Sequence, residues 1–267
     1  MKKLRLKINL KPWRRYILLG LAAYGIFLLQ QLSATLPYAL LEGTLQQNNV
    51  RVYGLQGTVW HGEMQRLEVQ GRSFDRVKWE LHPSSLLLGR LSASVSFVNA
   101  DSRISTRVSR GLGGGISLSD LRGRIGASEV LALAGIPAIK LDGQFNLNFD
   151  QLSLDGMVIT DAEGVLTWSS AGMQFPQRLQ LGDLSARFES VDEGVRATLG
   201  DGGGALESTG QLLLLAQGKY DFNGQFAARE GMESSLGRAL RMLGNPNAEG
   251  KISVKVSGSL TDLGLGG

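Results

Sequence analysis

The sequence predicts a mainly β protein, in which one N-terminal transmembrane helix precedes an antiparallel, meandering β-sheet domain with one or two short helices. Three observations support this fold class. Residues 16–41 carry no charge and follow a basic N-terminus; apolar and polar side chains alternate with a period of two through residues 50–260; and many of the 36 glycines fall between the alternating segments. Alternation alone leaves three arrangements open: an open sheet, a sandwich or a groove.

The positive charge of the chain is concentrated at its N-terminus. Residues 1–15 contain no acid and seven basic residues, which leaves 21 basic and 24 acidic residues for the remainder of the chain. The basic residues are Lys2, Lys3, Arg5, Lys7, Lys11, Arg14 and Arg15. The formal charge of +4 therefore does not indicate a nucleic-acid partner, because the bulk of the protein is slightly acidic.

The uncharged stretch predicts a membrane anchor over residues 16–36, because about 21 residues of helix span the roughly 30 Å of a bilayer core. A cleaved signal peptide is the alternative, but its best cleavage site, Leu32-Ser33-Ala34, has a leucine where a small residue is needed. An uncleaved anchor is favoured. The basic segment 1–15 then lies in the cytoplasm and the domain of residues 42–267 lies on the far side.

In the far-side domain, apolar and polar side chains alternate clearly in several predicted strands, among them 77–81, 91–97, 145–149 and 252–256. Asp-Gly and Asn-Gly pairs between them supply the positive φ angles of tight hairpin turns. An apolar stripe of Met232, Leu236, Ala239, Leu240 and Leu243 predicts an amphipathic helix, and a shorter helix is expected over 128–134. The run at 201–204 is predicted to be a flexible loop, since no Lys-Ser/Thr follows it as in a phosphate cradle.

The residues that usually carry chemistry form no recognisable constellation. The chain has no cysteine, and His61 and His82 lack acidic or cysteine partners at metal-ligand spacing. The acids Glu63, Glu68, Asp75 and Glu80 cluster in one region, but alternation puts Glu68 and Glu80 on solvated strand faces. The sequence therefore predicts a protein that is not an enzyme, with no catalytic residues, no cofactor and no metal site.

The apolar strand faces permit two functions of different kinds. They could pack into a closed core, leaving an exposed edge strand for protein partners, or they could line an open groove for lipid. The closed core is the favoured interpretation.

The stretch GLQGTVWHGE at residues 54–63 contains three glycines. Gly54 and Gly57 are expected to bracket a turn and Thr58–Trp60 to begin a strand, which Gly62 then ends or bulges.

The order of the motifs resembles protein N of the bacterial type II secretion system, also called general secretion pathway protein N. That family shows the pattern G-x-x-G-T-x-W-x-G, then V-x-W-x-L-x-P, then L-L-x-G-x-L. The first pattern matches Gly54, Gly57, Thr58, Trp60 and Gly62; the second matches Val77, Trp79, Leu81 and Pro83; the third matches, with slightly different spacing, Leu87, Leu88, Gly89 and Leu91.

The resemblance implies a non-catalytic, single-pass subunit of the inner membrane that takes part in exporting folded periplasmic proteins across the outer membrane. Its N-terminus would be cytoplasmic and its β domain periplasmic, where it would contact other secretion subunits. The family also looks akin to AsmA-type envelope proteins, whose strands form lipid-facing grooves. Lipid binding or transfer is therefore the alternative function.

Overall fold

The computed structural model describes residues 16–259 except 18, 22–23, 26, 29–30, 70, 100–101, 135–139, 157, 175–176, 230–233 and 243. Strands dominate this part of the chain. They are β1 (Val50–Tyr53), β2 (Gln56–Gly57), β3 (His61–Val69), β4 (Arg72–Leu81), β5 (Arg90–Asn99), β6 (Ser102–Gly111), β7 (Ile116–Gly126), β8 (Lys140–Asp155), β9 (Val158–Gln174), β10 (Arg178–Val191), β11 (Gly194–Asp201), β12 (Leu206–Leu215), β13 (Lys219–Ala228) and β14 (Ile252–Ser259).

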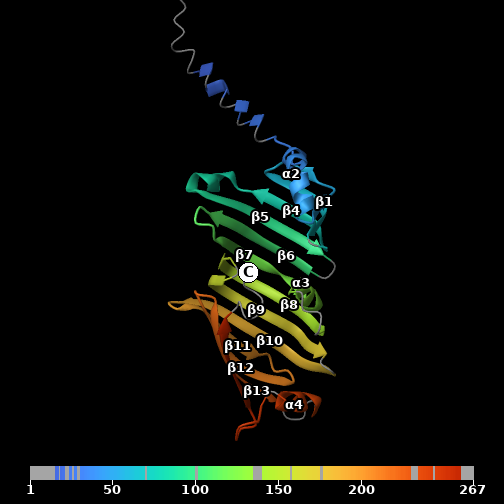
Figure 1. Cartoon of the computed structure of the whole chain (residues 1–267), viewed down its shortest axis with the longest axis vertical. Helices are drawn as coiled ribbons and strands as arrows, with labels where there is room; N and C mark the ends of the chain where they lie inside the picture. The colour runs from blue at the N-terminus through green and yellow to red at the C-terminus, as the bar shows by residue number, and fades with distance from the viewer. Residues whose placement is uncertain are drawn as a thin grey trace, which may run out of the picture.

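All fourteen described strands belong to one antiparallel sheet, and from β3 to β14 each strand pairs with the next along the chain. β1 and β2 both pair with β3 at the N-terminal edge. The result is one long, twisted sheet whose strands follow one another along the long axis of the molecule (Figure 1). The predicted antiparallel meander is confirmed, and of the three arrangements left open the sheet is an open one.

The sheet is a single layer. Among the described strands, those that are not neighbours in the sheet come substantially together only where β9 meets β11 and β10 meets β12. The favoured prediction of a closed core was therefore wrong for most of the sheet, because period-two alternation is the same whether or not a second layer covers the apolar face.

The two faces of the sheet differ in chemistry. The register pairs Met64 with Val77 and Trp79 with Val95, so these side chains share an apolar face. On the opposite face, Lys78 lies beside Ser96 and Glu80 beside Ser94. Similar apolar rows continue across the later strands, where Phe145 stacks on Trp168 with ring centroids 5.1 Å apart.

Irregularities in the ladders keep apolar residues on one face where the simple alternation fails. In β7 an extra residue at Asp120, with φ of 53°, shifts the register against β6 between Ser105 and Arg107. Leu118 and Leu121, three positions apart, can then point to the same side of the sheet. Ser170 in β9, with φ of 49°, accompanies a similar shift against β8.

The apolar face is packed most densely at its C-terminal end. There the helix α4 (Ser234–Arg241) places Leu236 and Leu240 against a cluster from β9, β10, β12 and β14. The buried members of the cluster are Ala171, Leu179, Leu181, Leu206, Leu236, Leu240 and Ile252. A second helix, α3 (Ala127–Ala134), packs on β7 and β8. Both lie along one side of the sheet in Figure 1.

The two predicted helices are confirmed in position. α3 starts one residue before the expected segment, and α4 occupies the middle of the expected stripe; Met232 and Leu243, at the ends of that stripe, lie outside the described residues. A third helix, α2 (Thr35–Gln47), was not predicted. It follows the apolar N-terminal stretch and carries no buried residue, so no stripe distinguishes it in the sequence.

The predicted membrane anchor is not confirmed. The basic segment 1–15 lies outside the described residues, and the stretch 16–36 is described only in part. Within the described part of the chain, no helix is both long enough and apolar enough to cross a bilayer.

Candidate functional site

The residues of the first family motif form a tight turn at the N-terminal edge of the sheet. β2 pairs with the start of β3, so that Gly57 lies opposite Gly62. Inside this turn the Thr58 N–H donates to the His61 carbonyl at 2.8 Å, and the Thr58 hydroxyl accepts from the His61 N–H at 3.3 Å. Gly57 has φ of 96°, which side chains rarely tolerate.

The position of this strand differs from the expectation. Thr58–Trp60 do not begin a strand and Gly62 does not end one; β3 begins at His61 and Gly62 is its second residue. The reason is the hydrogen bonding of Thr58, which closes residues 58–61 into a turn before the ladder can start.

The turn holds the segment of chain that follows the apolar N-terminal stretch. Ala34 N–H donates to the Gly57 carbonyl at 3.1 Å, and Val59 N–H donates to the Leu32 carbonyl at 2.9 Å. Ser33 and Thr58 form an antiparallel bridge between these two bonds. We call residues 32–34 and 57–62 together the junction. It ties the N-terminal segment to the sheet by backbone hydrogen bonds.

Residues of the second motif bind to the junction by hydrogen bonds and by packing. The Trp79 indole N–H donates to the Val59 carbonyl at 3.0 Å, and Leu81 N–H donates to the Trp60 carbonyl. A Cβ at Gly62 would lie 2.4 Å from Cζ2 of Trp79, so the indole fills the space over this glycine. Val77 is buried in the same strand. The glycine and the tryptophan of two separate motifs therefore make one packing unit.

The third motif forms a short connection rather than part of the core. Pro83 starts the 3₁₀ helix η1 (Pro83–Leu88), and Gly89 ends it in the left-handed conformation with φ of 66°. No residue of η1 is buried, and the side chain of Leu87 is 89% exposed. The leucines of this motif thus face solvent.

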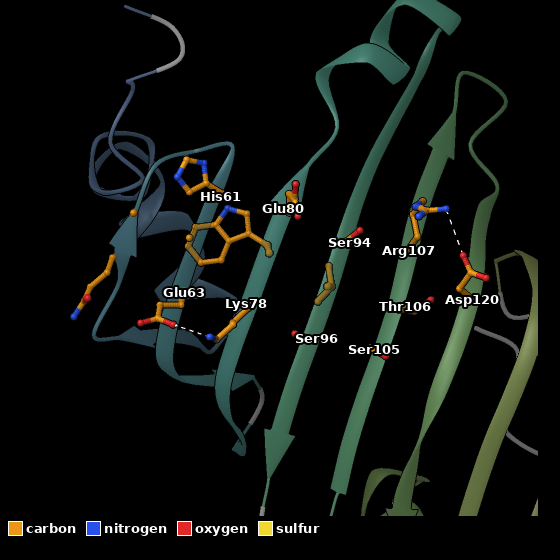
Figure 2. Close-up of a pocket in the computed structure, with 15 residues that line it drawn as sticks. His61, Glu63, Lys78, Glu80, Ser94, Ser96, Ser105, Thr106, Arg107 and Asp120 are labelled. Carbon is orange, nitrogen blue, oxygen red and sulfur yellow. Dashed lines mark hydrogen bonds and ion pairs between the residues drawn. The ribbon is translucent and has the colours of Figure 1, made fainter.

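A shallow polar hollow of about 730 Å³ lies beside the junction on the polar face. Figure 2 shows its lining, which comes from β2 to β7 and includes His61, Glu63, Lys78, Glu80 and several serines. Lys78 Nζ lies 3.3 Å from a Glu63 oxygen, and Arg107 lies 3.4 Å from Asp120. The charged groups of the hollow are largely paired with one another across strands.

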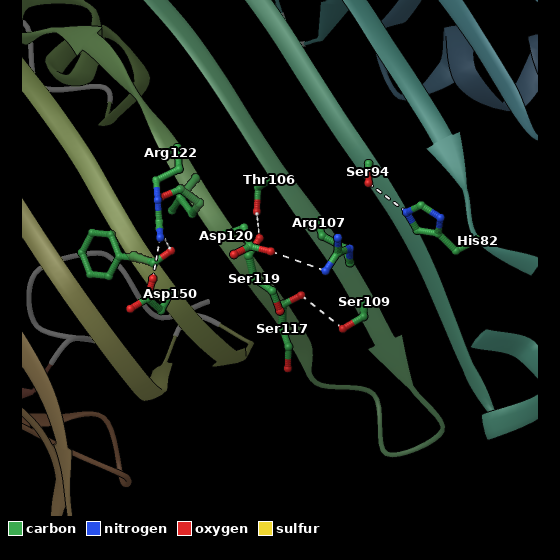
Figure 3. A network of polar contacts seen from close by, with 12 residues as sticks. His82, Ser94, Thr106, Arg107, Ser109, Ser117, Ser119, Asp120, Arg122 and Asp150 are labelled. Carbon is green, nitrogen blue, oxygen red and sulfur yellow. Dashed lines mark hydrogen bonds and ion pairs between the residues drawn. The ribbon is translucent and has the colours of Figure 1, made fainter. Parts of the chain in front are cut away.

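Polar contacts also link the neighbouring strands from β4 to β8 (Figure 3). The Thr106 hydroxyl donates to the Ser119 carbonyl at 3.2 Å, and Arg122 pairs with Asp150. His82 Nε2 lies 2.8 Å from the Ser94 hydroxyl. These bonds cross-link neighbouring strands, and exposed ion pairs of this kind contribute little stability each.

The histidines and acids that were considered as catalytic or metal-binding residues lie apart from one another or contact other side chains. His61 contacts the Thr58 hydroxyl at 3.3 Å, while Asp75 pairs with Arg66 at 2.9 Å, and this hydrogen bond and the Asp75 charge raise the pKa of Arg66. The Tyr53 hydroxyl donates to Glu68 at 3.4 Å. Among the described residues no three His, Cys, Asp or Glu side chains gather as a metal ion would require.

The glycines at 202–204 form a loop, as predicted, whereas Asp201 is the last residue of β11 and ties the loop in place. The Asp201 carboxylate accepts from the N–H groups of Gly203 at 2.9 Å and Ser208 at 3.0 Å, and pairs with Arg229 at 2.7 Å. Burial by itself raises the pKa of Asp201, but these hydrogen bonds and the Arg229 charge outweigh it and lower the pKa below its usual value.

The motif glycines and tryptophans are recognisable in the sequence, but their partners in the junction are not. Leu32, Ser33 and Ala34 take part through their backbones. Backbone hydrogen bonding leaves no mark on residue type, so no pattern could have identified them.

Comparison with known proteins places these motifs in a family. The family described as type II secretion system (T2SS), protein N, matches residues 48–255. Curated proteins named type II secretion system protein N are similar to the chain: one from Aeromonas hydrophila is 29% identical over 91% of this chain and 96% of its own length, and one from Vibrio cholerae serotype O1 is 28% identical over 84% and 88%.

A third protein of that name, from Pectobacterium carotovorum, is 22% identical over 89% of this chain. No solved structure matches at a significant level. Because the family match covers most of the sheet and both tryptophan motifs, the chain belongs to the type II secretion system protein N family.

Proposed function

We propose that this component of the type II secretion system is a non-catalytic subunit, anchored in the inner membrane by residues 16–36, with its N-terminus in the cytoplasm. The sheet lies in the periplasm and binds other secretion subunits. The basic residues of segment 1–15 support this orientation. The junction supports the attachment of the sheet close to the anchor, because two backbone hydrogen bonds, which form one antiparallel bridge, tie the end of the anchor to the start of the sheet.

The observation that carries the proposal is the free edge of β14. This strand pairs with β13 on one side, and among the described residues no strand pairs with its other side. Lys255, Val256 and Ser257 in the middle of β14 are exposed. A strand edge of eight residues offers backbone N–H and C=O groups to an incoming strand of a partner subunit.

Site-specific photo-crosslinking tests the edge. A crosslinker at Ser257 is expected to capture another secretion subunit in cells that are secreting. The matched control is Ser185, which is also exposed but lies in the interior strand β10. Equal capture from both positions, or none from Ser257, would contradict partner binding at this edge.

A deletion strain separates secretion from general envelope damage. Loss of the protein is expected to stop export of a type II substrate while the permeability of the envelope stays normal. An envelope defect with normal secretion would contradict the proposal.

The open apolar face favours one second function, the binding or transfer of lipid. Trp79, Val95 and Leu147 are only partly buried on this face, and no second layer of described strands covers it. A row of apolar side chains along a single-layer sheet suits acyl chains, since it shields them from water.

Paired substitutions in β5 test the lipid function. Val95→Glu puts a charge on the apolar face, whereas Ser96→Glu puts the same charge on the polar face of the same strand. If lipid is handled, Val95→Glu alone raises envelope permeability and reduces the lipid that copurifies with the chain. Equal effects of the two variants would exclude this function.

A further inference from the structure

An exposed apolar cluster lies along one side of the sheet, at the strand ends where the β4–β5 and β6–β7 connections meet. We call it the leucine rim; it consists of Leu86, Leu87, Leu88, Leu91, Leu112 and Ile116, whose exposed fractions run from 41% to 96%. Leu112 is the most exposed of them and lies beside Gly89, because a Cβ at Gly89 would be 3.6 Å from Leu112 Cδ1. Residues from two connections therefore form one surface.

The backbone keeps these leucines outside the core. η1 is a single short helix that ends at Gly89, so Leu86–Leu88 project from the tip of the β4–β5 connection and none of them is buried. The register pairs Leu91 of β5 with Arg110 of β6, and Arg110 in turn with Ile116 of β7. The rim is therefore a projecting edge of the apolar face, and exposed leucine in such a cluster marks a binding surface.

Two exposed arginines lie at the rim. Arg90 and Arg110 are both exposed, and neither takes part in any of the ion pairs found among the described residues. Asp155 lines the same hollow as Arg90 without pairing with it. Leucines flanked by unpaired arginines suit the boundary between acyl chains and anionic phosphates.

The position of the rim agrees with this chemistry. β4 to β7 lie in the half of the sheet nearer the N-terminal segment, whereas β11 to β14 lie at the far end (Figure 1). The junction joins that segment to β2 and β3, so a membrane that holds the segment lies near the rim. A projecting tip without aromatic residues also differs from the aromatic-rich patches typical of protein interfaces.

We propose that the leucine rim inserts into the surface of the bilayer, with Arg90 and Arg110 on the headgroups of anionic phospholipids. The inference rests on the proposed membrane anchor. Together the anchor and the rim would attach the sheet at two places and so set its tilt on the membrane. This contact would leave β14, at the other end, free for a partner.

Fluorescent labels on single cysteines test the insertion, since the chain has no cysteine of its own. The full chain is reconstituted in vesicles of phosphatidylglycerol and phosphatidylcholine that contain a lipid-borne quencher. Labels at Leu87→Cys and Leu112→Cys are expected to shift to the blue and to lose most of their fluorescence. The control label is at Asp192→Cys, which is exposed in the β10–β11 turn on the same side of the sheet and is expected to remain unquenched.

A label at Leu21→Cys separates the rim from the anchor. Quenching at Leu21 with none at Leu87 or Leu112 would overturn the rim and leave the anchor standing. No quenching at any of the three would overturn both. Labels at the rim that are protected from aqueous iodide yet unquenched by lipid would also overturn the proposal, because a protein surface then covers the leucines.

The arginines give a second readout. The double variant Arg90→Gln/Arg110→Gln is expected to lose much of the quenching of the label at position 87 on anionic vesicles. In the labelled chain that keeps both arginines, high salt should produce the same loss. Quenching that ignores both vesicle charge and salt would overturn the role of the arginines.

Discussion

Gly62 shows why a motif residue can be required without any chemistry of its own. A Cβ there would lie 2.4 Å from the Trp79 ring and 2.5 Å from the Gln56 carbonyl oxygen. Gly62→Val is therefore expected to force the ring or β2 away and to destabilise the fold by about 1–3 kcal/mol. Denaturant unfolding of the full chain in detergent, followed by tryptophan fluorescence, measures the change.

Gly111→Val is the matched control for that substitution. Gly111 also lies in the sheet, but nothing lies within 4 Å of a Cβ placed there. A loss of stability in Gly111→Val as large as that in Gly62→Val would contradict the packing role of Gly62.

Asp201 has the least exposed side chain of all partners in the ion pairs of the described residues. Its side chain is 11% exposed and holds two backbone N–H groups and Arg229. Asp201→Asn keeps the shape but removes the charge, so we expect a loss of about 2 kcal/mol at neutral pH. The exposed Asp192→Asn should cost almost nothing.

The same residue predicts a pH dependence. Because folding lowers the pKa of Asp201, its ionised form contributes stability above the unfolded pKa of about 3.9. That contribution is lost as the pH falls through the lowered pKa. The stability difference between the unsubstituted chain and Asp201→Asn should therefore shrink below about pH 4, and a constant difference would contradict this assignment.

At the scale of elements, α4 is the helix on which the dense end of the sheet depends. Leu236 is 2% exposed among residues of four strands. Leu236→Ala is expected to cost about 2–5 kcal/mol, because it leaves a cavity under the helix. Leu87→Ala, which removes the same atoms from an exposed leucine, should change the unfolding free energy by less than about 0.5 kcal/mol.

The elements differ in how far the sequence reveals them. Strands such as Phe145–Phe149 and the amphipathic α4 follow from periodicity, because one face of each meets apolar neighbours. The extra residue at Asp120 does not, since a bulge depends on how two strands align. α2 was missed for a related reason: it buries no residue and so shows no stripe.

At the scale of the whole molecule, the junction is expected to set the direction of the anchor relative to the sheet. Ala34→Pro tests this sharply, because Ala34 has φ of −61°, which proline adopts, while its N–H donates to Gly57. Removing this bond should widen the distance distribution between spin labels at Leu28→Cys and Glu80→Cys. Ala34→Val, which adds similar bulk but keeps the N–H, should leave the distribution narrow.

The chain shows a clear division between what its sequence determines and what depends on tertiary structure. Side-chain alternation, turn glycines and the order of three motifs were enough for the antiparallel meander and for the family, because these features are local. Whether the apolar faces close on each other was decided only by the tertiary structure, since one-sided burial looks the same under a second layer or in an open sheet. The junction at residues 32–34 and the exposure of Leu87 depend likewise on contacts between distant segments, which no local pattern records.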